Sequence, residues 1–251
     1  MAIVRHSKFN RYKNLIFSLK VLNEETLKSK TFLLEKDEKK KIEVYYAPFD
    51  YINEEARIVI VGITPGWYQM KQAFSAVKSA NHQWSDEEIL HEVKKQASFS
   101  GPMRKNLITM LDELQLQNHL GLSSTSELFG KANHFVHTVS ILSYPVFYKG
   151  KNYNGSTPNM LKSELLKKYI LQQFTKELLA LDNPLIIPLG VNVSKVLLYL
   201  AENGYIDHEL ILRGFPHPSG GNGHRHKQFA ENKEGMKQQL ERYFVKKMNK
   251  L

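Results

Sequence analysis

The chain contains no cysteine among its 251 residues. This absence excludes disulfides, thiolate nucleophiles, zinc sites built on cysteine and iron–sulfur clusters held by cysteine. No apolar run approaches the roughly 18 residues that a membrane-spanning helix needs. Residues 1–20 mix basic with apolar side chains and lack the pattern of a signal peptide. We therefore expect a cytoplasmic protein with no membrane segment.

Acidic residues are outnumbered by basic ones, 25 against 35, which gives a formal net charge of +10. Excess positive charge favours polyanionic partners, nucleic acid first and anionic membranes second. The alternative is that most of these lysines are simply solvated. A hydrophobic share of 42% is typical of a soluble globular protein that buries one substantial core.

Apolar patterns along the chain predict alternating strands and helices. We expect strands over 42–46, 58–61, 135–142, 185–190 and 209–212, and helices within 1–22 and over 86–97, 102–114, 157–181 and 192–203. The basic segment 227–251 is expected to form one helix or a pair of helices. This alternation predicts the α/β class, with a three-layer α/β/α sandwich around a central, mainly parallel sheet. Residues 1–56 are expected to form an N-terminal extension that packs on a main domain of residues 57–251.

Two loops with unusual composition follow predicted strands. The first, residues 62–66, reads Gly-Ile-Thr-Pro-Gly, and the second, residues 217–221, reads His-Pro-Ser-Gly-Gly. Open α/β sheets bind their ligands at the carboxyl ends of strands, where such glycine-containing loops bring backbone close to a ligand. Either loop alone is weak evidence for a binding site, because Gly-Pro segments are usually turns. As a pair they predict one site built from two loops.

These loops resemble the motifs of the uracil-DNA glycosylase superfamily, a G-x-x-P-[GY] water-activating loop and an H-P-S loop. The resemblance runs from about residue 57 to about 244. Phe99, three residues before Pro102, is similar to the family's aromatic residue that stacks on an extruded base. His137-Thr138-Val139 is similar to the strand that presents an asparagine to the base edge. The resemblance implies a DNA glycosylase of DNA repair that flips out a base and hydrolyses its N-glycosidic bond.

The resemblance also implies residue roles. His217 hydrogen-bonds the departing base, and Thr64 takes the water-activating position. The expected base-binding residues are Gly62, Ile63, Pro65, Gly66, Phe99 and His137. The expected DNA-binding residues are Ser219, Gly220, Gly221, Asn222, Arg225 and Lys227. The expected partner is DNA, single or double stranded, bound by a monomer with no cofactor and, lacking cysteine, no iron–sulfur cluster.

Three departures from the family pattern leave alternatives open. Thr64 stands where members carry Asp or Asn, and a hydroxyl orients water but is no base near neutral pH. His137 replaces the asparagine, so the base need not be uracil, and its imidazole is equally well explained by a bond to backbone. Residues 220–223 offer no apolar wedge, which favours single strands or weakened pairs. The alternative function is a catalytically inactive nucleic-acid-binding module on the same fold.

Two further interpretations are weaker. His217, His224 and His226 have spacings compatible with a metal, but no carboxylate completes the set nearby, so we expect surface histidines and no metal. An unrelated α/β hydrolase is disfavoured in its commonest form because the sequence has no G-x-S-x-G elbow.

Overall fold

The computed structural model describes residues 2–248. Two compact units divide these residues, and the chain passes between them several times. Unit 1 comprises residues up to 54 together with 63–99 and 138–180. Unit 2 comprises residues 55–62, 100–137 and 181 onward.

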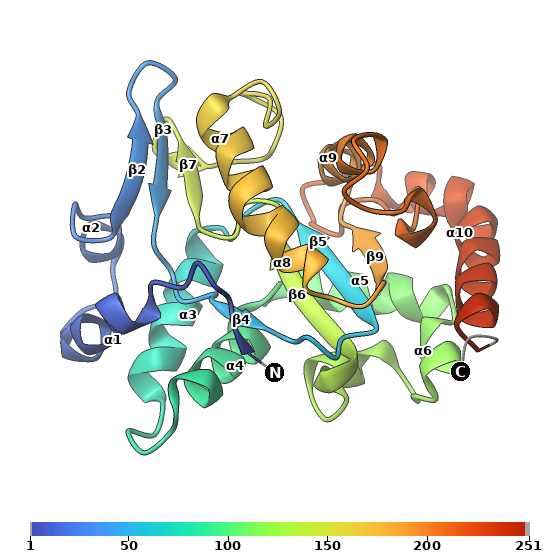
Figure 1. The fold of residues 1–251 in the computed structure, drawn as a ribbon, viewed down its shortest axis with the longest axis horizontal. Coiled ribbons are helices and arrows are strands. Elements are labelled where there is room, and N and C mark those ends of the chain that lie inside the picture. Colours follow the sequence, from blue (N-terminus) through green and yellow to red (C-terminus); the bar gives the residue numbers. More distant parts are fainter. Residues whose placement is uncertain (1, 249–251) are drawn as a thin grey trace. The chain divides into compact units, whose positions relative to one another are not determined.

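Unit 1 contains a four-stranded antiparallel sheet in the order β2-β3-β7-β8, of which the first three strands are labelled in Figure 1. The charged residues 38–41 make the turn between β2 and β3, where Lys40 N donates to Asp37 Oδ1 at 2.9 Å. A second, two-stranded sheet pairs β1 with β4. The strands of this unit are β1 (Ala2–Ile3), β2 (Leu33–Asp37), β3 (Ile42–Tyr45), β4 (Tyr51–Ile52), β7 (Val146–Tyr148) and β8 (Lys151–Asn152).

The helices of unit 1 bury amphipathic faces. In α1, Phe9, Tyr12 and Ile16 are buried at spacings of three and four, as a core-facing stripe requires. The helices are α1 (Phe9–Ser18), α2 (Glu24–Leu27), α3 (Trp67–Ser79), α4 (Asp86–Ala97), α7 (Glu164–Tyr169) and α8 (Thr175–Leu179), with a π-helical turn at Ile170–Phe174 between the last two.

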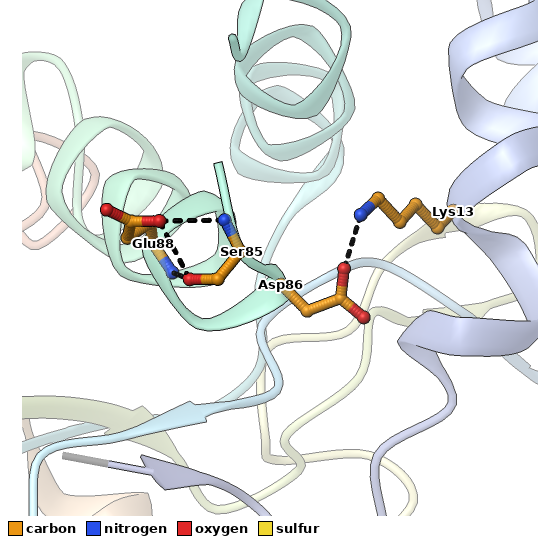
Figure 2. A network of polar contacts seen from close by, with 4 residues as sticks. All are labelled: Lys13, Ser85, Asp86 and Glu88. Carbon is orange, nitrogen blue, oxygen red and sulfur yellow. Dashed lines mark hydrogen bonds and ion pairs between the residues drawn. The ribbon is translucent and has the colours of Figure 1, made fainter. Parts of the chain in front are cut away.

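The start of α4 is fixed by side chains, as Figure 2 shows. Ser85 N donates to Glu88 Oε2 at 2.7 Å, and Glu88 N donates to Ser85 Oγ at 3.3 Å. This capping box satisfies two backbone groups that the first turn leaves open. Asp86 also forms an ion pair with Lys13 of α1. The capping box and the ion pair together fix the start of α4, the helix that contains Lys94.

Unit 2 contains the parallel pair β5 (Ile58–Gly62) and β9 (Leu185–Pro188), which lie side by side in Figure 1. All residues of β5 are buried. The three-stranded sheet has the order β6-β5-β9, and β6 (Val136–Ser140) begins in unit 2 and continues into unit 1. The helices are α5 (Pro102–Glu113), α6 (Leu116–Leu120), α9 (Val191–Glu202) and α10 (Arg225–Met248), with 3-10 turns at Thr125–Phe129, Asn133–Phe135 and His208–Leu210.

Most predicted elements are confirmed. The apolar run 58–61 is β5, the capping box at Ser85 opens α4, and Pro102 is the first residue of α5. The strand expected over 185–190 ends at Pro188, which has no N–H to donate to a neighbouring strand. The basic segment 227–251, expected to form one helix or a pair, is the single helix α10 up to Met248, and its last residues lie outside the described part of the chain.

The strand predicted over 209–212 is wrong. Residues 208–210 form a 3-10 turn, and only a single parallel bridge joins Ile211 to Ile186. The reason is local, because the Asp207 side chain accepts a hydrogen bond from Glu209 N at 2.8 Å and turns the chain there.

Two helix predictions also need correction. The helix expected from 157 begins at Glu164, because the Asn159 side chain accepts hydrogen bonds from Leu161 N and Lys162 N and holds a turn instead. Helix α3, Trp67–Ser79, is absent from the helices that the sequence predicted.

Among the described residues, no helix is long and apolar enough to cross a membrane. The expected N-terminal extension, residues 1–56, stays a prediction about domain boundaries. In the structure, residues 2–54 belong to the same compact unit as 63–99 and 138–180.

Candidate active site

The loop that follows β5 is held by the side chain of Thr64 in unit 1. Thr64 Oγ1 donates to Tyr144 O at 2.9 Å and accepts from Val146 N at 3.0 Å. A hydroxyl has one proton to donate, and here that proton is committed to a backbone carbonyl. Thr64 therefore ties the loop to the segment that leads into β7, and only acceptor capacity remains for a water.

Gly66 ends this loop, and α3 begins at the next residue. Trp67 N donates to Asn152 Oδ1 at 2.9 Å, and Gly66 N donates to Gln69 Oε1 at 3.2 Å. A Cβ at Gly66 would lie 3.4 Å from Asn152 Nδ2, which is ordinary van der Waals contact. These bonds satisfy N–H groups that a helix start leaves open. Asn152 of β8 therefore shapes the loop, a role that the sequence did not indicate.

A small pocket in unit 1 brings two predicted base-binding residues together, Pro65 and Phe99. Its volume is about 20 Å³, room for about one water. Phe99 is 4% exposed and has φ 51°, a left-handed conformation that a residue with a Cβ rarely adopts. Such conformations cost about 1–3 kcal/mol and concentrate at functional sites. Other lining residues are Phe49, Lys94, Ser98, Thr138 and Ser143.

Lys94 lines this pocket although it is only 7% exposed. Its Nζ donates to Thr138 O at 2.7 Å. Burial lowers the pKa of the Lys94 ammonium, while the charges of Glu177 and Asp50 raise it. Lysines are almost never fully buried unless a partner compensates them. The pocket therefore contains an amine whose protonation depends on two neighbouring carboxylates.

Asp50, one of these carboxylates, is 1% exposed and fully hydrogen-bonded. Tyr46 Oη donates to its Oδ2 at 2.8 Å, and Tyr144 Oη donates to its Oδ1 at 2.7 Å. Burial raises the pKa of Asp50 to about 6, against the lowering effects of both tyrosines and of Lys94. Burial also raises the pKa of Tyr46 and Tyr144 well above the ordinary value, so both remain donors.

In unit 2, the carboxyl ends of β5 and β9 meet the histidine-containing loop. Val61 pairs with Pro188, and Gly190 N donates to Phe215 O at 3.2 Å. Gly190 has φ 92°, and a Cβ there would lie 2.8 Å from the Cβ of His217. Only glycine fits this approach. His217 therefore lies beside the end of β9, the neighbour of the strand that ends at Gly62.

The His217 imidazole has a defined orientation. Ser219 N donates to its Nδ1 at 3.2 Å. Because Nδ1 accepts, the neutral ring carries its proton on Nε2, which is then a donor. Burial lowers the pKa of His217, so the neutral form persists below the ordinary value of 6.5. The site thus offers a neutral N–H donor on a ring that the backbone orients.

Three side chains brace the backbone of residues 217–219. Asn106 Nδ2 of α5 donates to Pro218 O at 2.8 Å, and Asn222 Nδ2 donates to His217 O at 3.2 Å. Arg225 Nη1 donates to Ser219 O at 2.9 Å. Arg225 and Asn222 were predicted to contact DNA, and this structure gives each of them a contact that holds the loop. Their DNA contacts stay predictions.

His137, predicted to read the base, is buried on β6 in unit 2. The pocket of unit 1 is lined by the following residues, Thr138 and Val139. Thr138 Oγ1 donates to Ser98 Oγ at 2.8 Å, which links the strand to the end of α4. The base-reading role of His137 stays a prediction.

The remaining predicted DNA-binding residues lie at the surface of unit 2. Gly220, Gly221 and Lys227 are exposed, and Lys227 Nζ lies 4.0 Å from Glu231 Oε1. Within residues 2–248, no group of three or more His, Asp or Glu side chains is arranged to hold a metal ion.

Sequence reasoning missed Lys94 and Asp50. Lys94 carried a usable signal, because α4 buries Leu90, Lys94 and Ala97 at spacings of four and three, which puts a lysine on the apolar stripe. Asp50 carried none, since the segment around it has no periodic pattern and its two partners lie in different parts of the chain.

Comparison with known proteins shows the family of the chain. Residues 49–242 match the family model described as the uracil DNA glycosylase superfamily. The chain is also 43% identical over 200 residues, 78% of each chain, to the "Uncharacterized protein YoxB" of Bacillus subtilis (strain 168). No solved structure matches. The family match covers well over half of the chain, and the fold class expected from the sequence, a three-layer α/β/α sandwich, is that of the family. The chain belongs to the uracil DNA glycosylase superfamily.

Proposed function

We propose that the chain is a DNA glycosylase-like hydrolase that breaks the N-glycosidic bond of an extruded uracil-like or modified base. The observation that carries this proposal is the His217 ring, whose Nδ1 accepts from Ser219 N and whose Nε2 is left as the donor. In an oxocarbenium-like transition state the base departs with negative charge. A fixed donor aimed at developing charge is typically worth about 10²–10³ in rate. His217 is proposed as that donor.

The Phe99 ring, which lines the small pocket together with Pro65, supports a base as ligand. An aromatic ring stacks on any base, because every base has a π-face. Enzymes that act on a base take it out of the stack, which is the reason to propose base flipping. The net charge of +10 supports a polyanionic partner, DNA.

Thr64 favours the second candidate, a nucleic-acid-binding module without catalysis. Its proton is committed to Tyr144 O, so the side chain neither abstracts a proton nor donates one to a water. If the chain is a hydrolase, most of the rate acceleration comes from stabilising the negative charge on the departing base and not from activating water. Location in the cytoplasm and a monomeric state stay predictions.

A screen of oligonucleotides tests the proposal. Single- and double-stranded oligonucleotides, each carrying one uracil, hypoxanthine, xanthine or other altered base, are incubated with the full chain, and abasic sites are detected by cleavage in alkali. We expect abasic sites from at least one base. The matched control is His217→Asn, which lacks the distal donor and is expected to give a rate near background.

DNA binding by the same samples separates the two candidates. Base release that disappears in His217→Asn supports the hydrolase. Binding to DNA without release from any base in the panel supports the module. Absence of both binding and release contradicts the two candidates together.

A further inference from the structure

A second pocket in unit 1 has a volume of about 400 Å³ and shares no lining residue with the small pocket beside Phe99. Ligand pockets commonly measure about 300–1,000 Å³. Its wall comes from the start of α1, from β2, and from the end of α7 with the π-helical turn that follows; α1, β2 and α7 are labelled in Figure 1. The lining residues within 8–12 and 33–35 precede the segment that matches the family model, 49–242, so the family match does not cover this part of the wall.

Two backbone irregularities border the second pocket. In β2 the pairing with β3 shifts register between Leu33 and Glu35, which is a β-bulge, and residues 33–35 line the pocket. After α7, residues Ile170–Phe174 form the π-helical turn, and its two glutamines, at 172 and 173, line the pocket. A β-bulge re-aims side chains along a strand, and π-helical turns are frequent at functional sites. Both irregularities thus act on residues that line one pocket.

Two lining residues, Gln173 and Glu35, each have a buried oxygen atom without a partner. Gln173 Oε1 and Glu35 Oε2 accept no hydrogen bond from the described residues. The other oxygen of Glu35, Oε1, accepts from Lys168 Nζ at 2.5 Å. Tyr169 is a further neighbour of this carboxylate, since burial first and Glu35 second raise the pKa of its hydroxyl. The clearest free acceptor is therefore Gln173 Oε1. Because the large majority of buried polar atoms are satisfied, these oxygens call for an occupant that donates hydrogen bonds.

Positive charge gathers at the second pocket. Lys8, Arg11 and Lys168 line it, against the single carboxylate of Glu35. Lys168 is paired with that carboxylate, whereas no ion pair joins Lys8 or Arg11 to an acidic side chain of the described residues. Arg11 is exposed, and its guanidinium carbon lies 5.2 Å from the centre of the Tyr12 ring. Two unpaired cations favour an anionic group, and a guanidinium binds phosphate through two parallel N–H donors.

We propose that the second pocket binds a guanine nucleotide, with the phosphate at Lys8 and Arg11 and the edge of the base at Gln173 and Glu35. The guanine edge presents two adjacent donors, N1–H and the N2 amino group, which two acceptor oxygens satisfy. Thymine presents one N–H between two carbonyl oxygens, and adenine presents one amino group beside an acceptor nitrogen. The nucleotide is either free or part of a DNA strand, since both sources carry this base and a phosphate. The site goes beyond the proposed function, which does not use it.

Isothermal titration calorimetry on the full chain tests the inference. The probes are dGMP, dAMP, dTMP and deoxyguanosine, the last of which lacks the phosphate. Affinities are measured for the wild-type chain, for Gln173→Met, which removes an acceptor, and for Arg11→Met, which removes a cation. The matched controls are Gln83→Met and Arg5→Met, because both residues are exposed, belong to unit 1 and do not line the pocket.

We expect the wild-type chain to bind dGMP about tenfold more tightly than each other probe, as the loss of one donor or of the phosphate implies. Gln173→Met should weaken dGMP about tenfold and bring its affinity close to that of dTMP, whereas Arg11→Met should weaken both nucleotides alike and the two controls should match the wild type. No binding, as a pocket filled by water alone predicts, overturns the inference, and so do equal affinities for the three nucleotides or equal effects of Gln173→Met and Gln83→Met. If circular dichroism finds Gln173→Met unfolded, the exposed position 11 decides, and equal dGMP affinities of Arg11→Met and Arg5→Met overturn it.

Short oligothymidine strands with and without one central guanine distinguish the two sources of the nucleotide. Tighter binding of the guanine strand that is lost in Gln173→Met assigns the second pocket to DNA. Dependence on Gln173 for dGMP alone assigns it to a free nucleotide, and dependence in neither overturns the inference. No base release is measured here, so the hydrolase and the nucleotide site are refuted by different results.

Discussion

Replacing His217 by asparagine is the most direct perturbation of the proposed chemistry. Asparagine carries an amide oxygen near the position of Nδ1, so it can still accept from Ser219 N, which donates to His217 at 3.2 Å in the wild-type chain. It has no atom near Nε2. The substitution therefore removes the distal donor and retains the loop contact. Glutamine reaches further and keeps a donor near Nε2, which makes His217→Gln the matched control.

The magnitude follows from what the donor does. If Nε2–H stabilises the departing base, its loss should slow base release by about 10²–10³, which is about 2.7–4 kcal/mol in the transition state. The binding affinity for DNA should change little, because the charge on the base develops only in the transition state. Single-turnover base release with enzyme in excess measures this rate, on the base that the oligonucleotide screen identifies.

The pH dependence gives a second readout of the same ring. Burial lowers the pKa of His217. Protonation would add an N–H at Nδ1 that faces Ser219 N–H, donor against donor. The wild-type rate of base release should therefore stay level as pH falls through 6.5 and drop only below the lowered pKa. The rate of His217→Asn should show no such drop at low pH. A rate for His217→Asn within about threefold of wild type would refute the leaving-group role, since one lost donor predicts at least about 10².

Three other predictions follow from the buried contacts. Thr64→Val should lower the free energy of unfolding in urea by about 1–3 kcal/mol, because two backbone groups lose their partner, while Thr64→Ser should not; equal losses would refute the structural role. Between pH 4 and 6 the pKa of about 6 for Asp50 means that the folded state binds more protons than the unfolded state, so stability falls as pH rises. Asp50→Asn should remove up to about 3 kcal/mol of this dependence, and an unchanged pH profile of urea unfolding would contradict it. Arg225→Ala should slow base release even at low salt, because Ser219 O loses its hydrogen-bond donor. Lys227→Ala should only reduce, by about one, the slope of the logarithm of DNA affinity against the logarithm of salt concentration. Identical effects of the two variants would contradict this division of roles.

Local sequence patterns determined the main elements and the two loops. The run 58–61 is apolar and β-branched, and it is a strand buried along its whole length. Ser85 and Glu88 have the capping-box spacing, and α4 begins there. Pro102 begins α5 because a first-turn residue needs no backbone N–H. Each of these signals acts within a few residues, which is why the sequence alone contains it.

Competition between local signals explains the failures. The 209–212 segment has apolar residues suited to a strand, but Asp207 turns the chain before it can pair. The helix expected from 157 starts later because the Asn159 side chain caps a turn first. In both segments a short polar side chain satisfied nearby backbone groups, and an apolar pattern takes no account of such bonds.

Tertiary structure alone decided the hydrogen-bond partners of Thr64, Asp50 and Lys94. Thr64 was predicted to face a water, but its hydroxyl bonds to backbone about 80 residues away in the sequence. Asp50 is fixed by tyrosines 4 and 94 residues distant. Only the tertiary structure places Lys94 in one pocket with Thr138 and Ser143. Hydrogen bonds, burial and the resulting pKa values depend on which atoms meet in space, and a sequence read in order specifies the residue types but not those meetings.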